Sequence, residues 1–130
     1  MRQTQPSATQ RRQRAQRRGR YAEWLCLWHL RLHGWRILAR GWRCPSGEID
    51  ILARRRGVLA IIEVKAREEI ADAASALAPR QQRRIARAAE AFLASHPDLA
   101  GLDLRFDLML VAPFRFPRHW HGAWLANGSG

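Results

Sequence analysis

Apolar residues recur along the chain at spacings that change from helical to strand-like. In residues 20–33 they repeat every three or four positions, which predicts an amphipathic helix, and Gly34 suits its C-terminal cap. Residues 80–95 show the same spacing and predict a second helix, which ends before Pro97 because proline disfavours a helical residue ahead of it.

Five shorter segments have the alternation or the continuous apolar run that is typical of β-strands. Two of them flank Arg56 and Gly57, a two-residue turn that predicts a hairpin. Residues 68–78 are rich in alanine and are compatible with a short helix or a loop. The predicted strands cover residues 35–43, 48–55, 58–65, 103–112 and 119–126.

The predicted order is a helix, three strands, a second helix and two strands. Helices and strands alternate only late in the chain, which predicts an α/β domain with a mixed sheet and helices packed on it. We expect this domain to cover residues 20–126. Residues 1–19 are polar, basic and without apolar periodicity, so we expect a disordered arm.

The formal net charge is +12, from 23 basic and 11 acidic residues. This excess predicts a polyanionic partner, and nucleic acid is the commonest such partner. We expect the partner to be DNA. A GC-rich genome would favour arginine and alanine in a similar way, so the charge indicates a class of partner and not a reaction. The arginines expected to contact phosphates are Arg17 and Arg18 of the arm and Arg80, Arg83 and Arg84 of the second helix.

No apolar run approaches the length of a membrane span, and no apolar segment typical of a secretory signal follows the N-terminal arginines. Cys26 and Cys44 lie eighteen residues apart, which matches neither a zinc-binding pair nor a disulfide framework. We therefore expect a cytoplasmic protein with two reduced thiols and no membrane partner.

Charged residues of the predicted hairpin should gather on one face of the sheet. With Arg56 and Gly57 as the turn, the register sets Asp50 opposite Glu63, and Glu48 opposite Lys65. Residues two apart share a face, so the four charges form a square. Opposed acids repel each other, and Mg²⁺ or Mn²⁺ would offset this repulsion by binding the carboxylate oxygens. A turn shifted by one residue would separate the acids.

Lys65 is the only lysine among the 23 basic residues, which indicates a position that requires a compact ammonium. A metal held by Asp50 and Glu63 would polarise a phosphodiester and lower the pKa of a bound water. Lys65 would orient or deprotonate that water, and Glu23 on the first helix could also reach the metal. The alternative is a solvated hairpin face, since charged residues alternating with isoleucine are typical of half-exposed strands.

The segment Gly47–Arg67 resembles the core signature of the YraN-like uncharacterised bacterial protein family. That family is similar to the PD-(D/E)xK restriction-endonuclease-like superfamily, and the resemblance extends over residues 19–126. It implies a restriction-endonuclease-like mixed sheet flanked by helices. Members often carry lysine where this chain has Gln81, which weakens the expectation of a cationic phosphate contact at that position.

The resemblance also implies roles for individual residues. Asp50 and Glu63 would be the metal-binding carboxylates, and the backbone carbonyl of Val64 would be a further ligand. Lys65 would be the catalytic lysine, and Glu23 would match the acidic residue that many superfamily members carry on the first helix.

Two histidine pairs have spacings that could bind a metal. His119 and His121 share a face of the last strand, and His29 and His33 are four apart on the first helix. Without a third ligand at a suitable spacing, we favour a surface role for the first pair and a packing role for the second.

Arg105 and Asp107 share a strand face and predict an ion pair. The six tryptophans could stack on bases, but we expect most of them to be buried or half-buried in the core. Those expected there are Trp24, Trp28, Trp35 and Trp42.

Three hypotheses follow. The first is a divalent-metal-dependent nuclease that hydrolyses phosphodiesters of DNA or of structured nucleic acid. The second is a non-catalytic nucleic-acid-binding protein with a nuclease-like fold. The third is an assembly protein whose basic arm binds RNA, and only the arm supports it.

Overall fold

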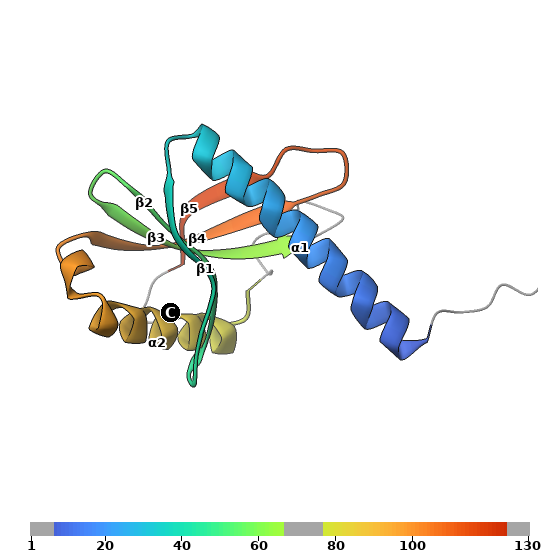
Figure 1. Ribbon diagram of the computed structural model, residues 1–130, viewed down its shortest axis with the longest axis horizontal. Helices are drawn as coiled ribbons and strands as arrows, with labels where there is room; N and C mark the ends of the chain where they lie inside the picture. Colours follow the sequence, from blue (N-terminus) through green and yellow to red (C-terminus); the bar gives the residue numbers. More distant parts are fainter. Residues whose placement is uncertain (1–6, 67–76, 125–130) are drawn as a thin grey trace, which may run out of the picture.

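The computed structural model describes residues 7–66 and 77–124, and of residues 8–18 it describes the helical backbone only (Figure 1). Two long helices cover a five-stranded sheet. The elements in chain order are α1 (Ala8–Leu32), β1 (Arg36–Cys44), β2 (Gly47–Arg55), β3 (Val58–Ala66), α2 (Pro79–Ser95), the short 3₁₀ helix η2 (Pro97–Leu99), β4 (Asp103–Val111) and β5 (Arg118–Trp124).

The sheet is mixed, as predicted. Its strand order is β1-β2-β3-β4-β5, and all neighbouring pairs are antiparallel except β3 and β4, which are parallel. The connection from β3 to β4 contains α2, since parallel neighbours need a crossover. The predicted α/β class and element order are confirmed, and the arrangement is consistent with a restriction-endonuclease-like fold.

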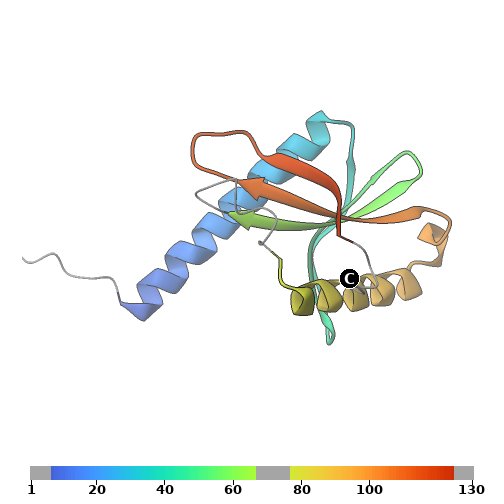
Figure 2. The ribbon, with the colours of Figure 1, turned by 180° about the vertical axis from the view of Figure 1, so that it is seen from behind.

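The helices pack on opposite faces of the sheet, and both views show the sheet between them (Figures 1 and 2). Alternate residues of the central strands face α1 or α2, so they belong to two separate core clusters. Leu52 and Ile61 belong to the α2 cluster with Phe92, whereas Ile51 and Ile62 belong to the α1 cluster. The α1 cluster also contains Ala22, Cys26, Leu30 and Trp35.

Helix α1 begins at Ala8, so the predicted start at Arg20 is wrong, and residues 8–19 are helical rather than irregular. The first turns are rich in alanine, glutamine and arginine, which favour helix. The prediction relied on apolar periodicity, which this stretch lacks. Residues 1–6 and most of the alanine-rich segment 68–78 lie outside the described residues, so the division into arm and domain stays a prediction.

The expectation for the tryptophans is wrong for two of the four. Trp24 and Trp28 on α1 are 53% and 49% exposed, whereas Trp35 is buried and Trp42 is half-buried. Neither exposed tryptophan belongs to the core cluster that α1 forms with the sheet. In the part of the chain that the structure describes, neither helix combines the length and the apolar content needed to cross a membrane.

The buried carboxylate of Asp107 joins β4 to β5. Arg105 donates to both of its oxygens at 2.8 and 2.9 Å, which confirms the predicted ion pair. His119 Nε2 lies 2.7 Å from Oδ2, and the backbone N–H of Gly122 donates to Oδ1 at 2.9 Å. Burial alone would raise the pKa of Asp107, but these hydrogen bonds outweigh it and lower the pKa to about 2.

We expect Asp107→Asn to lower the free energy of unfolding by about 3 kcal/mol at neutral pH, because Arg105 and His119 lose their buried anion. The carboxylate's contribution is present above its ordinary pKa of 3.8 and is lost as the pH falls towards 2. The difference between the two proteins should therefore narrow over that range in urea unfolding. Asp103→Asn, at an exposed position of the same strand, is the control, and an equal loss in both variants would contradict the assignment.

Candidate functional site

Strands β2 and β3 separate where the acids were predicted. Their pairing runs from the turn to Ile51 and Ile62, which confirms the predicted turn and register over five residue pairs. Beyond that point β3 stays paired with β4 to its last residue, and β2 stays paired with β1. Asp50 and Glu63 are the next residues, so they lie at a fork between the two strands.

Asp50 connects the two arms of this fork. Its Oδ2 accepts a hydrogen bond from the backbone N–H of Val64 at 2.8 Å, in place of a backbone acceptor from β2. Gly41 lies on β1 between the partners of Ile49 and Ile51, and its φ of 57° is a conformation that favours glycine. Ile49 and Ile51 belong to different core clusters, so β2 changes its orientation at Asp50.

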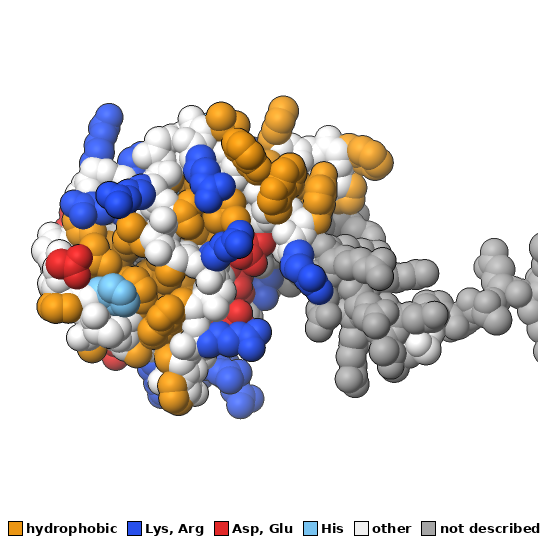
Figure 3. Space-filling model, in the orientation of Figure 1, with side chains coloured by type: hydrophobic (Ala, Val, Ile, Leu, Met, Phe, Trp, Pro, Cys, Tyr) orange, Lys and Arg blue, Asp and Glu red, His pale blue; other side chains and the backbone are white. Residues whose placement is uncertain are grey.

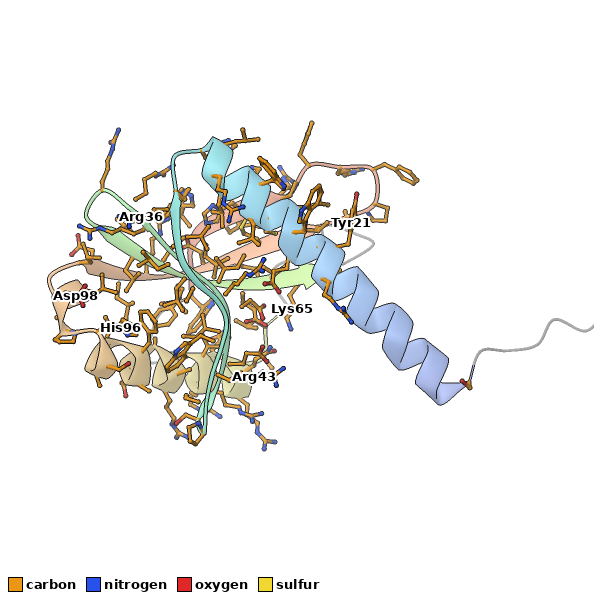
Figure 4. All side chains as sticks on the ribbon, in the orientation of Figure 1. Tyr21, Arg36, Arg43, Lys65, His96 and Asp98 are labelled. Carbon is orange, nitrogen blue, oxygen red and sulfur yellow. The ribbon has the colours of Figure 1, made fainter. Side chains whose placement is uncertain are left out.

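Glu63 is buried at 7% exposure and has two polar neighbours besides Asp50. Lys65 Nζ lies 3.4 Å from its Oε1, and Gln81 Nε2 donates to the same oxygen at 3.1 Å. Glu63 and Lys65 are two apart on β3 and share a face, as predicted. In the view of Figure 4, Lys65 and Arg43 lie between α1 and the start of α2.

Glu48 does not oppose Lys65, so this part of the predicted square is wrong. Glu48 pairs with Arg43 of β1, and Arg43 Nε lies 3.4 Å from Glu48 Oε1. The physical reason is the fork: the last β2–β3 pair is Ile51 with Ile62, so Glu48 lies in the part of β2 that no longer pairs with β3. The charged group is therefore a triad of Asp50, Glu63 and Lys65, with Glu48 at its border.

Two hollows of about 550 and 540 Å³ meet at Asp50. The first lies against α1, and Glu23, Val64 and Arg20 are among its lining residues. The second lies against the first turns of α2 and is lined on that side by residues that include Gln81 and Arg84, with Glu63 opposite. Figure 3 shows acidic side chains in a recess bordered by basic ones.

The acids at the fork hold their protons more tightly than free side chains. Burial raises the pKa of Glu63 to about 8, with the charge of Asp50 adding to it and Lys65 opposing it. Burial also raises the pKa of Asp50, against the hydrogen bond from Val64. The pKa of Glu23 is raised by burial and then by the charge of Asp50. The fork thus gathers acidic groups whose ionised forms are unfavourable without a cation nearby.

The donor set suits a hard divalent cation. Asp50 and Glu63 offer carboxylate oxygens, and Mg²⁺ is commonly bound by one or two carboxylates together with waters and phosphate oxygens. Glu23 lines the same hollow as Asp50, but Asp50, Glu63 and Glu23 do not bring three ligand atoms within 4.8 Å of one another. Glu23 would therefore contact a metal at Asp50 through water or after a side-chain movement.

Among the described residues, the one set of three that does meet this distance is Asp107, His119 and His121. Sequence reasoning missed this third ligand because Asp107 is on β4. Both of its oxygens already accept two donors each, so a metal here would displace the contact with His119. We therefore assign a structural role to Asp107, His119 and His121.

The other histidine pair lies on α1. The rings of His29 and His33 stack, with their centroids 4.1 Å apart.

Only some of the arginines that were predicted to contact phosphates lie at the site. Arg80, Arg83 and Arg84 are exposed at the start of α2, and Arg84 lines the hollow that contains Glu63. Arg17 and Arg18 lie on α1, where only the backbone is described. The contact of Gln81 with Glu63 was not predicted, because α2 and β3 are distant in sequence.

We expect Glu63→Gln to flatten the dependence of stability on pH when divalent metal is removed with a chelator. The pKa of Glu63 is raised in the folded state, so its contribution is complete below 4.5 and is lost as the pH rises through about 8. Between these values the wild type should lose on the order of 2 kcal/mol more than the variant in urea unfolding. Glu90→Gln, at an exposed position of α2, should keep the wild-type slope; equal slopes in all three proteins would refute the expectation.

Known proteins match the region of the chain that contains the candidate site. A family model described as uncharacterised protein family UPF0102 matches residues 22–111, which include the whole fork. A UPF0102 protein of Rhodopseudomonas palustris (strain BisA53) is 52% identical over 111 residues, covering 85% of each chain. Another, from Parvibaculum lavamentivorans, is 53% identical over 110 residues, covering 85% of this chain and 83% of that protein.

A third relative, from Bradyrhizobium diazoefficiens, is 52% identical over 112 residues and covers 86% of this chain and 84% of its own length. These matches are nearly full-length and agree with the motif resemblance of the hairpin. The chain therefore belongs to the uncharacterised protein family UPF0102, the YraN-like family.

Proposed function

We propose that this protein is a divalent-metal-dependent phosphodiesterase that acts on DNA or on structured nucleic acid. One observation carries the proposal: half-buried Asp50 and buried Glu63 are neighbours at the fork, and the only lysine of the chain lies 3.4 Å from Glu63. Two acids beside each other and partly shielded from water destabilise a fold unless a cation or a proton is present. The arrangement therefore suits a site that binds a cation.

Asp50 and Glu63 would hold Mg²⁺ or Mn²⁺, with the Val64 carbonyl as the further ligand that the family resemblance implies. The metal, when bound, supplies polarisation of the phosphodiester and a more acidic water. The hydrogen bond from Val64 to Asp50 fixes one carboxylate, and Gln81 fixes the other. Both ligands are thereby held in place before substrate binds, which lowers the cost of ordering them.

Lys65 supplies a positive charge on the same face as Glu63. Its ammonium would orient the attacking water and stabilise the charge that develops on the phosphate. Arg84 and Arg43 line the hollow that contains Glu63 and would hold the neighbouring phosphates of the strand. The nucleic acid would approach from this side, where both hollows open at Asp50.

The alternative is a nucleic-acid-binding protein without turnover. It is favoured by the raised pKa of Glu63, because a protonated carboxyl binds a metal more weakly than a carboxylate does. Gln81, where family members often carry lysine, also leaves Glu63 with one cation fewer. Measured turnover decides between the two functions.

We expect the purified protein to cleave supercoiled, linear or branched DNA with Mg²⁺ or Mn²⁺, and Asp50→Asn and Lys65→Met to reduce the rate at least about 100-fold. Asparagine at position 50 keeps an oxygen for the N–H of Val64, so the fold should survive. Gel assays measure cleavage, and Asp103→Asn is the control. DNA binding without cleavage in the wild type would support the alternative, and cleavage that both variants retain would contradict the proposed site.

We expect Gln81→Lys to move the acid limb of the pH–rate profile towards lower pH by about one unit. An ammonium near Glu63 favours its ionised form, so less alkaline conditions would suffice for metal binding. Gln81→Met removes the amide without adding charge and should not produce this shift. Profiles of cleavage rate against pH measure the effect, and a shift in the methionine variant alone would contradict the assigned contact.

A further inference from the structure

Three exposed aromatic side chains surround an apolar groove beside the fork. Phe114 and Phe116, in the loop between β4 and β5, are 107% and 90% exposed, and Tyr21 of α1 is 62% exposed. They line a hollow of about 720 Å³ together with apolar residues of α1 and the loop, a volume in the range of small-ligand sites. Figure 3 shows hydrophobic side chains gathered on this part of the surface.

Folding does not account for Phe114. Its side chain is fully exposed, so it adds nothing to the core, and its backbone φ is 59°, which is unfavourable for a bulky residue. The aromatic surface continues along α1. Tyr21 and Trp24 stack with ring centroids 6.2 Å apart, and Trp28 meets Trp24 edge-on at 6.3 Å.

The groove adjoins the candidate metal site. Ala22 and Ala66 line both the aromatic groove and the hollow that contains Glu23 and Asp50. A polymer whose phosphate lies at the fork would therefore reach the groove with its neighbouring residues. No acidic residue is among those that line the groove, whereas Arg115 is.

We propose that this aromatic groove binds unpaired bases of a DNA strand whose phosphate lies at the fork, so that the substrate contains single-stranded DNA. This inference rests on the proposed function. Bases of an intact duplex are stacked inside it and cannot enter a groove, whereas unpaired bases stack readily on aromatic side chains. A second copy of this chain is a poorer occupant, because it brings the same charge of +12 to the contact.

The test measures binding separately from cleavage. Fluorescence anisotropy in Ca²⁺ compares the binding of a short single-stranded DNA, a forked DNA and a matched duplex. We expect the double variant Phe114→Ala, Phe116→Ala to bind single-stranded and forked DNA about tenfold more weakly, which corresponds to the loss of stacking on one base. Duplex binding, which depends on phosphate contacts, should change by less than about twofold.

Leu32→Ala is the matched control, because Leu32 is an exposed apolar residue of α1 outside the groove. A 2-aminopurine in the single strand reports stacking directly: the wild type and Leu32→Ala should quench its fluorescence, and the double variant should not. Thermal unfolding checks that the variants remain folded.

An equal loss of affinity for duplex and single strand, or no loss for either, would overturn the inference. So would a wild type that dimerises in sedimentation while the double variant stays monomeric, since the groove would then hold a second copy. Selective binding and quenching without any cleavage in Mg²⁺ would leave the groove assigned and would refute the phosphodiesterase. Cleavage without selective binding of single-stranded DNA would support the phosphodiesterase and would refute the assignment of the groove.

Discussion

The hydrogen bond from the N–H of Val64 to the carboxylate of Asp50 determines the geometry of the whole candidate site. Beyond Ile51 the edge of β3 no longer pairs with β2, and an unpaired N–H there would be costly to bury. Asp50 satisfies that donor with its side chain, so β2 can turn away without leaving it unpaired. The two hollows exist because the strands part at this residue.

Acidic residues lie around the separated strands, and their polar neighbours do not fully offset the effect of burial on their pKa values. Glu63 has Lys65 and Gln81 as neighbours, yet its pKa remains raised, mainly because it is buried. Helix α1 adds Glu23 and a buried thiol, Cys26, whose pKa is raised to about 12 by burial and by the charge of Asp50. This thiol is therefore an inert part of the core, and the acids are the groups whose protonation depends on what binds at the fork.

The sequence predicted those parts of the structure that depend on local pattern. The turn at Arg56 fixed the register as far as Ile51, and with it the meeting of Asp50 and Glu63. The sequence could not predict the fork, because it depends on the pairing of β2 with β1, in which Gly41 adopts a positive φ. For the same reason Glu48 was assigned the wrong partner.

Contacts between distant elements were also beyond the sequence. Gln81 of α2 contacts Glu63 of β3, and Asp107 of β4 contacts His119 of the neighbouring strand β5. Trp24 and Trp28 were expected in the core because tryptophan is usually well buried there. Their positions on α1 place them opposite the face that carries Ala22, which only the packing of the helix reveals.

The single lysine in a chain of arginines has a physical explanation at the fork. A guanidinium is planar and pairs with both oxygens of a carboxylate, which would hold Glu63 against a cation that needs the same oxygens. The ammonium of Lys65 contacts Glu63 through Oε1 at 3.4 Å and acts as a point charge. It can balance part of the negative charge while leaving the carboxylate able to bind a metal, so lysine suits this position and arginine does not.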